Sequence, residues 1–332
     1  MTSQYDVLGL GNAIVDVISM VDDDLLAREK LAKGGMMLID EARTESLYKQ
    51  MGSTSIISGG SAANTIVGAA SFGAKTAFIG KVKADETGKA FAHDIRAIGV
   101  EFTTKPAQDG PATARCLIFV TPDGERTMNT FLGACQNLGP DDVDADLVRA
   151  SAITYLEGYL WDPPAAKQAF VRASEIAHAA GRRVALTLSD QFCVDRYRAE
   201  FLELIRNKTV DILFANQHEL KSLYETSDFD SAVAALRNED ILGAVTVSEK
   251  GSLVVTRGET LAVPAYPIQK LVDTTGAGDL YAAGFLAGLS RDQDLKTCAQ
   301  LGALAASEVI QHVGARPQRS LAAMASENGL GV

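Results

Sequence analysis

The stretch "DTTGAGDLYAAGFLAGL" (residues 273–289) joins a short polar run directly to a long apolar segment. Residues 280–289 have the composition of a buried helix, and the residues before them predict its first turn. This turn contains three small residues, Gly276, Ala277 and Gly278. Their uncovered N–H groups at a helix N-terminus would bind an anion. The carboxylate of Asp279 would repel that anion, so we expect Asp279 to have a chemical function.

The overall composition of the chain restricts its class. The 332 residues are 47% hydrophobic and 22% charged, which fits one large α/β domain or two modest ones. The net charge of -11 argues against binding to nucleic acid, although backbone amides can still hold a small anion. The four cysteines are widely spaced and indicate neither a disulfide scaffold nor a zinc site. We find no secretory signal and no membrane-spanning run, and we expect a cytoplasmic protein.

Strand and helix patterns alternate along most of the chain. The expected strands are 5–11, 75–82, 152–159, 183–190, 210–216 and 243–249. The expected helices are 64–74, 164–181, 198–207 and 231–238. Such alternation indicates βαβ units, and therefore an α/β fold with a mostly parallel sheet between two layers of helices.

Two parts of the chain interrupt this alternation. Residues 12–21 with 34–40, and residues 112–133, are expected to form antiparallel ribbons. The second ribbon has a turn at "PDGE" (122–125), which is typical of a hairpin. Ribbons beside a parallel sheet predict a small β flap over a site at the carboxyl ends of the strands.

The loop at 273–279 has two interpretations. A tight turn with packing glycines is the simpler one. The charge of Asp279 favours the second, because bare amides would stabilise a phosphoryl group in transfer and a carboxylate could accept the proton of an attacking hydroxyl. A second loop–helix junction contains small and polar residues that could bind sugar hydroxyls or simply allow close packing: Gly59, Gly60, Ser61 and Asn64.

Over essentially its full length the chain resembles the PfkB carbohydrate kinases of the ribokinase-like superfamily. The resemblance rests on "DTTGAGD", a highly specific motif, and on residues 58–88. It implies a single three-layer domain over 1–332, with a discontinuous β lid formed by about 12–45 and 98–134. It also implies ATP and Mg²⁺, with Asp279 as the catalytic base. The amides of the preceding small residues would then hold the γ-phosphoryl group.

The resemblance extends to residues on the nucleotide side. "NQHE" matches the family motif Asn-x-x-Glu, which implies that Asn216 binds ATP and that Glu219 organises Mg²⁺ through water, although such a pair is often only a solvated helix start. In "TVSEKG" Thr246 and Gly251 match the family, whereas Ser248 replaces a glycine. The resemblance also implies that Asp273 and Thr275 are ligands of a monovalent cation such as K⁺, and that Thr275 contacts ATP as well. It further implies that His312 lies beside the adenine of ATP. His312 fits a histidine satisfied at a helix end equally well.

The substrate side most resembles the adenosine kinase branch. There the residues matching Asn12 and Asp16 hold a ribose, and a carboxylate can accept bonds from two neighbouring hydroxyls. The resemblance suggests walls for the base at Leu38, Cys116, Phe131 and Tyr159. Arg126 is either near the substrate or facing solvent, and Met36 stands where this branch often has a polar residue. Adenosine to AMP is therefore the expected reaction.

Other functions were compared with this one. A fructokinase- or ribokinase-like sugar kinase is the alternative within the family. A dinucleotide fingerprint at "LGLGNA" fails because Ile14 stands where a small residue is needed, and no GxxxxGK[ST] motif occurs. A nucleoside-binding protein without activity would gain nothing from Asp279. Either a monomer or a homodimer is compatible with the sequence.

Overall fold

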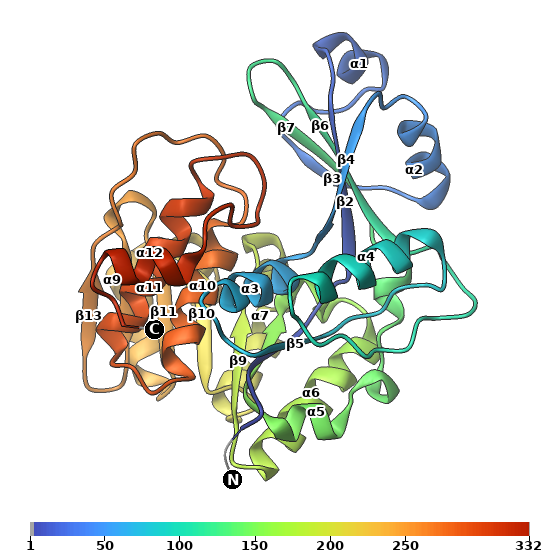
Figure 1. Ribbon diagram of the computed structural model, residues 1–332. Coiled ribbons are helices and arrows are strands. Elements are labelled where there is room, and N and C mark those ends of the chain that lie inside the picture. Colours follow the sequence, from blue (N-terminus) through green and yellow to red (C-terminus); the bar gives the residue numbers. More distant parts are fainter. Residues whose placement is uncertain (1–2, 332) are drawn as a thin grey trace.

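The computed structural model describes residues 3–331 and contains two separate β-sheets (Figure 1). The larger sheet has eight strands, namely β1 (Tyr5–Leu10), β5 (Thr76–Ile79), β8 (Ser151–Glu157), β9 (Arg183–Thr187), β10 (Ile212–Asn216), β11 (Leu242–Thr246), β12 (Ser252–Val255) and β13 (Thr260–Val263). The smaller sheet has five, namely β2 (Ile14–Met20), β3 (Met36–Leu38), β4 (Thr54–Gly59), β6 (Ala114–Val120) and β7 (Arg126–Phe131).

The α-helices of the described residues are α1 (Asp23–Arg28), α2 (Glu41–Tyr48), α3 (Ser61–Ser71), α4 (Glu86–Ala97), α5 (Ala145–Ala150), α6 (Pro164–Ala179), α7 (Gln191–Arg206), α8 (Gln217–Leu223), α9 (Phe229–Asn238), α10 (Ala277–Leu289), α11 (Leu295–Val309) and α12 (Leu321–Glu327). Short 3₁₀ helices are η1 (Gly133–Asn137), η2 (Pro140–Asp142), η3 (Gly158–Trp161) and η4 (Ser248–Lys250). None of the helices between residues 3 and 331 combines the length and apolarity needed to cross a membrane.

The large sheet has the strand order β13-β12-β11-β10-β9-β8-β1-β5, and it confirms the expected α/β architecture. The strands from β5 to β11 in this order pair in parallel, whereas β12 and β13 continue the sheet in antiparallel pairs. The chain moves to one side from β1 to β5 and to the other from β8 onward. Ligands bind beside the carboxyl ends of strands at such a switch point, here between β1 and β8.

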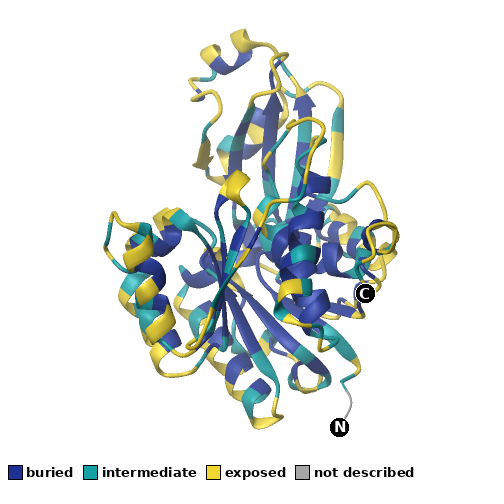
Figure 2. Cartoon of the chain, turned by 90° about the vertical axis from the view of Figure 1, so that its left-hand side faces the viewer, coloured by how far each residue is buried: buried dark blue, intermediate teal, exposed yellow. Residues whose placement is uncertain are grey.

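Helices cover both faces of the large sheet, which gives the expected three layers. One face packs against α5, α6, α7, α8 and α9, and the other against α3, α10 and α11. The strands of the large sheet are largely buried, whereas β3 and part of β4 in the small sheet are exposed, as are the outer sides of the helices and the loops (Figure 2). The strand residues form near-continuous apolar runs because helices bury them from both sides.

The small sheet stands above the carboxyl ends of the large sheet (Figure 1), with the order β3-β7-β6-β2-β4. The hairpin of β6 and β7 confirms the expected ribbon at 112–133. The ribbon expected between 12–21 and 34–40 is wrong, because β2 pairs with β4 and β6 whereas β3 pairs with β7. The strand β4 lies outside the segments expected for the lid, although it pairs along the whole of its length with β2.

Close packing between α10 and α11 holds the N-terminus of α10 in place. Gly284 lies at the centre of α10, and a Cβ there would come within 2.4 Å of the backbone of Leu301 on α11. At the first turn of α10, in contrast, a Cβ on Gly278 would meet no atom within 4 Å. The two glycines therefore have different functions, one in helix packing and one in leaving the helix start uncovered.

We predict that Gly284→Ala lowers the free energy of unfolding by about 1–3 kcal/mol, because backbone atoms must move to accommodate the methyl group. The matched control Gly278→Ala should leave this free energy unchanged or raise it by up to about 1 kcal/mol, since alanine favours the helix. Urea titration followed by circular dichroism measures both values. Equal stability of the two variants would contradict the packing described for Gly284.

Candidate active site

Asp279 lies in the first turn of α10, at the carboxyl edge of the large sheet, and it is partly buried. Its Oδ1 accepts a hydrogen bond of 2.6 Å from the Ser61 hydroxyl, and its Oδ2 accepts one of 3.0 Å from Nδ2 of Asn64. Burial raises the pKa of Asp279 to about 6, although these hydrogen bonds and Arg316 lower it. The carboxylate is thus positioned by α3 and is able to exchange a proton near neutral pH.

The turn before Asp279 places backbone amides at the start of α10, and the amide of Ala277 donates to the Thr274 carbonyl at 3.2 Å. Gly276 has a φ of +81°, which is the left-handed conformation that glycine adopts without strain. A Cβ on Gly276 would also lie 2.7 Å from the Cβ of Ala315, so this position is closely packed. The N-terminus of α10 is open at Gly278, where the amides and the helix dipole favour an anion.

The arginine of "GARP" was not predicted from the sequence as a site residue. Arg316 lies beyond α11, and its Nε donates a bond of 2.9 Å to Oδ1 of Asn64. Both ends of the Asn64 side chain are therefore bonded within the protein, to Asp279 and to Arg316. Asn64 thus supports the Asp279 carboxylate, and its expected contact with sugar hydroxyls stays a prediction.

A buried glutamate joins the switch-point strands and was likewise missed by sequence reasoning. Glu157 ends β8, and its carboxylate accepts bonds from Nδ2 of Asn12 at 2.6 Å and from the amide of Ala62 at 2.8 Å. Burial raises the pKa of Glu157 to about 7, against the effect of these bonds. The Asn12 side chain is buried and is held by Glu157 just beyond β1. Only the position of Glu157 at a strand end, in "LEGY", could have marked it.

One row of residues crosses all five strands of the small sheet at the level of Asp16. In the order of the strands these residues are Leu38, Thr130, Cys116, Asp16 and Ile57. Paired residues project from the same face of a sheet, so an apolar surface continues on both sides of Asp16. Burial raises the pKa of Asp16 to about 6, against Arg126 and Arg316, and no described residue donates a hydrogen bond to its carboxylate.

The two glycines expected beside the substrate, Gly59 and Gly60, lie where β4 leads into α3. A Cβ on Gly59 would lie 2.5 Å from Oδ2 of Asp16, and one on Gly60 would lie 2.2 Å from the carbonyl oxygen of Asn12. These glycines let α3 begin directly beside the substrate-side residues.

Phe131 does not share the face of Asp16, which corrects its expected contact with the base. It pairs with Arg115, whose guanidinium bonds to Glu45 on α2, and the side-chain period of two places both on the opposite face. Tyr159 belongs to η3 of the main body, is 38% exposed, and lies near the charges of Asp190 and Asp279. Contact of Tyr159 with a base stays a prediction.

An ion pair connects the small sheet to the loop before α10. Arg126, at the start of β7, pairs with Asp273, and both side chains are only 8% exposed. Of the two alternatives left open for Arg126, this arrangement favours a position near the site over one facing solvent. Asp273 also accepts bonds from the amides of Thr275 at 2.9 Å and Gly314 at 3.0 Å. Since Arg126 already neutralises Asp273, the carboxylate does not fit a K⁺ ligand in this conformation.

The Asn-x-x-Glu pair forms a capping box at the start of α8. Asn216 accepts from the amide of Glu219 at 2.9 Å, and the Glu219 carboxylate accepts from the amide of Asn216 at 2.9 Å. Glu219 is only 5% exposed and forms no ion pair with a described residue, and burial raises its pKa to about 7. A buried carboxylate without a cation fits a hydrated Mg²⁺, which prefers oxygen ligands and keeps several waters.

The remaining residues expected at the nucleotide lie around the ends of β11 and α11. Thr246 ends β11 beside Asn216, and Ser248 and Gly251 both have positive φ, of +50° and +97°. Ser248 therefore adopts a conformation that glycine adopts more easily. His312 lies 3.2 Å from the buried carboxylate of Glu308, as expected for a histidine satisfied at a helix end. Its contact with adenine stays a prediction.

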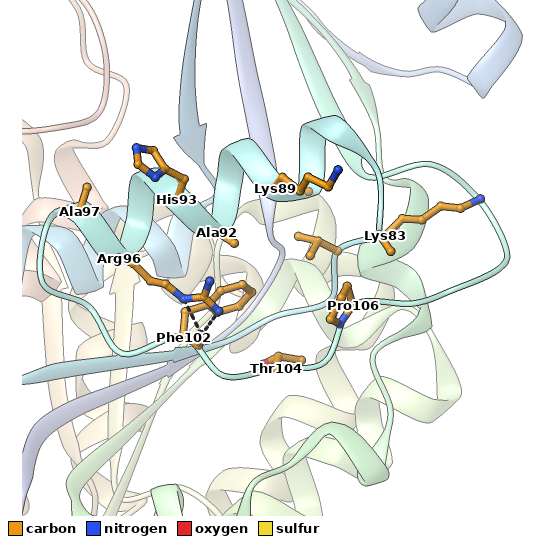
Figure 3. Close-up of a pocket in the computed structure, with 12 residues that line it drawn as sticks. Lys83, Lys89, Ala92, His93, Arg96, Ala97, Phe102, Thr104 and Pro106 are labelled. Carbon is orange, nitrogen blue, oxygen red and sulfur yellow. Dashed lines mark hydrogen bonds between the residues drawn. The ribbon is translucent and has the colours of Figure 1, made fainter.

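A cavity of about 730 Å³ lies between α4 and residues 102–106, and none of the residues of the Asp279 site lines it. Its lining residues include no Asp or Glu. Figure 3 shows the Arg96 guanidinium bonded to the Phe102 carbonyl, and the amino groups of Lys83 and Lys89 directed away from Phe102. This cavity contains no carboxylate, and neither Asp16 nor Asp279 lines it, so we do not assign the chemistry to it.

We predict that Glu157 makes the protein less stable as the pH rises from about 5 to 8. Its pKa is about 7 in the folded protein and near 4.5 in the unfolded chain, so between these values the folded protein binds a proton that the unfolded chain has released. The free energy of unfolding therefore falls as the pH rises and this proton leaves. The loss is on the order of 3 kcal/mol. The variant Glu157→Gln can keep hydrogen bonds to Asn12 and Ala62 if the side-chain amide of Asn12 turns by 180°. Because glutamine does not titrate, the variant should have a weaker dependence of stability on pH. Identical slopes of unfolding free energy against pH would contradict the prediction.

Comparison with known proteins agrees with this geometry. A model of the "pfkB family carbohydrate kinase" matches residues 28–321. The structure of adenosine kinase from Sinorhizobium meliloti is 55% identical, with a TM-score of 0.91 over 98% of this chain and 100% of that chain. A probable sugar kinase from Rhizobium etli is 51% identical, with a TM-score of 0.93 over 99% and 100%. Adenosine kinase of Saccharomyces cerevisiae is 28% identical over 92% of this chain and 94% of its own.

The family model covers most of the chain, including the loop of Asp279, and the fold is the same as that of close structural relatives over nearly their whole length. The chain therefore belongs to the pfkB family of carbohydrate kinases, and it is a kinase.

Proposed function

We propose that this kinase transfers the γ-phosphoryl group of ATP to the 5′-hydroxyl of adenosine and produces AMP. The observation that carries the proposal is the pair of partly buried carboxylates, Asp16 on the small sheet and Asp279 at the uncovered start of α10. The first has no hydrogen-bond donor among the described residues, and the second is held by donors beside an anion site. A molecule with a diol at one end and a reactive hydroxyl at the other could donate hydrogen bonds from the diol to Asp16 and place the hydroxyl at Asp279.

The apolar row beside Asp16 favours a nucleoside over a plain sugar. A base attached to the ribose would lie over Cys116 and Leu38, whose side chains continue the face of Asp16. Leu38 is 56% exposed, so a bound base would bury apolar surface there. The adenosine kinase of S. meliloti supports the same assignment, whereas the probable sugar kinase of R. etli keeps a sugar kinase as the alternative.

The reaction requires one proton transfer and one phosphoryl transfer. Asp279 accepts the proton of the 5′-hydroxyl as its oxygen forms a bond to the γ-phosphorus. The bond from that phosphorus to the β,γ-bridging oxygen breaks, and ADP leaves with the electron pair. The amides at Gly276, Ala277 and Gly278 stabilise the negative oxygens of the group in transfer. A pKa of about 6 leaves Asp279 ionised at neutral pH, as a base must be.

Mg²⁺ would neutralise charge on the phosphates of ATP when it is bound. Glu219 would hold it through water, and the capping bonds from Asn216 keep this carboxylate oriented. The small sheet would close over the substrates and exclude water, so that ATP is not hydrolysed. A cytoplasmic location and a monomeric or dimeric state stay predictions from the sequence.

We predict that Asp279→Asn lowers kcat for adenosine phosphorylation by about 10²–10⁴-fold, because the 5′-hydroxyl loses its proton acceptor. ATP consumption measured with adenosine, inosine, ribose and fructose should show turnover with adenosine above the other acceptors. The matched control is Asp292→Asn, beyond the other end of α10. Asp292 has a φ of +56°, a left-handed conformation that asparagine also adopts readily, so the substitution should not strain the backbone. This control should retain full activity.

The outcomes separate the reaction from the substrate. Turnover with a sugar alone, still lost in Asp279→Asn, would replace adenosine by the sugar and retain the base. Equal kcat in the native protein and Asp279→Asn would refute the proposed mechanism.

A further inference from the structure

Arg316 connects the proposed base to the rest of the site through a continuous set of hydrogen bonds. Its Nη2 donates to the Ser58 hydroxyl at 3.0 Å, and Ser58 in turn donates to Asp94 on α4. Its Nε donates to Oδ1 of Asn64 at 2.9 Å. Its Nη1 is buried without any partner among residues 3–331.

The chemistry of the guanidinium determines how Asn64 is oriented. Arginine has donors only, so Asn64 must turn its carbonyl oxygen toward Arg316. Its Nδ2 then necessarily faces Asp279, where it donates to Oδ2 at 3.0 Å. Ser61 donates to the other oxygen at 2.6 Å. Asp279 is thus surrounded by donors, and donors stabilise the ionised form of a carboxylate.

Arg316 also supplies positive charge where several acids converge. It lowers the pKa of both Asp16 and Asp279, although burial raises both. The other titratable groups that interact with Asp279 are all acids: Asp16, Glu157, Tyr155 and Tyr159. The second cation near this group, Arg126, acts on Asp16 and is paired with Asp273. Arg316 is therefore the cation whose charge reaches Asp279 directly.

We propose that Arg316 is a positioning residue that fixes the Asn64 amide against Asp279 and thereby keeps Asp279 ionised for proton transfer. This inference rests on the proposed function, because it assigns Asp279 as the base. A purely structural arginine would tie the loop after α11 to α3 and β4 without affecting protonation. The two possibilities differ in how activity depends on pH.

We predict that Arg316→Gln moves the acid limb of the profile of kcat/KM against pH upward by about one unit or more. Activity with adenosine and ATP should consequently fall about fivefold or more further at pH 6 than at pH 8.5. Arg316→Lys keeps the positive charge but loses the planar set of N–H donors that holds Asn64 and Ser58. It should therefore retain the native acid limb of the pH profile and have a lower kcat at every pH. The matched control is Arg319→Gln, three residues further, whose exposed guanidinium pairs with Glu327. It should have the native profile.

A uniform loss of activity at all pH values in Arg316→Gln, with an unshifted limb, would overturn the inference while the proposed function stands. If Arg316→Gln does not fold, Arg316→Lys decides, since a shifted limb there would equally overturn it. If the native protein phosphorylates no acceptor, the proposed function fails. Titration of the aspartate carboxyl carbons by ¹³C NMR in native protein and Arg316→Gln then tests the inference alone. Unchanged titration of Asp279 would refute it.

Discussion

The rest of the site depends on one electrostatic constraint, the placement of the Asp279 carboxylate beside amides that attract an anion. Such a group is costly to keep charged, and burial outweighs the groups that lower its pKa, so that the pKa is about 6. Ser61 and Asn64 offset this cost with two hydrogen bonds, and Arg316 adds positive charge. The same balance applies to Asp16, so the charge state of the site depends on residues from five separate segments of the chain.

The fold brings these segments together at the switch point of the large sheet. β1 leads into Asn12, β8 ends at Glu157, and their parallel pairing places both at one edge. The tight contact of α10 with α11 then positions the start of α10 above this edge. The small sheet adds Asp16 from the opposite side. Substrate contacts from two sheets fit a reaction in which water must be excluded.

The parts of the site that were predictable from the sequence are local in the chain. The loop of Asp279 combines a helix start, bare amides and a charge within seven residues, and the alternating strands follow from their apolar periods. Long-range partners could not be predicted in this way. Arg316 contacts Asn64 across 252 positions, and β4 joins the small sheet by pairing that no local pattern reveals. Phe131 was misplaced because its face depends on strand register, which a shift of one residue reverses.

The most direct test is a crystal structure with adenosine and a non-hydrolysable ATP analogue bound. The account predicts that the ribose diol donates to Asp16 and that the 5′-oxygen lies at hydrogen-bond distance from Asp279. The γ-phosphoryl group would face the amides of Gly276, Ala277 and Gly278. A ribose bound with its 5′-oxygen away from Asp279, or a γ-phosphoryl group away from those amides, would contradict the account.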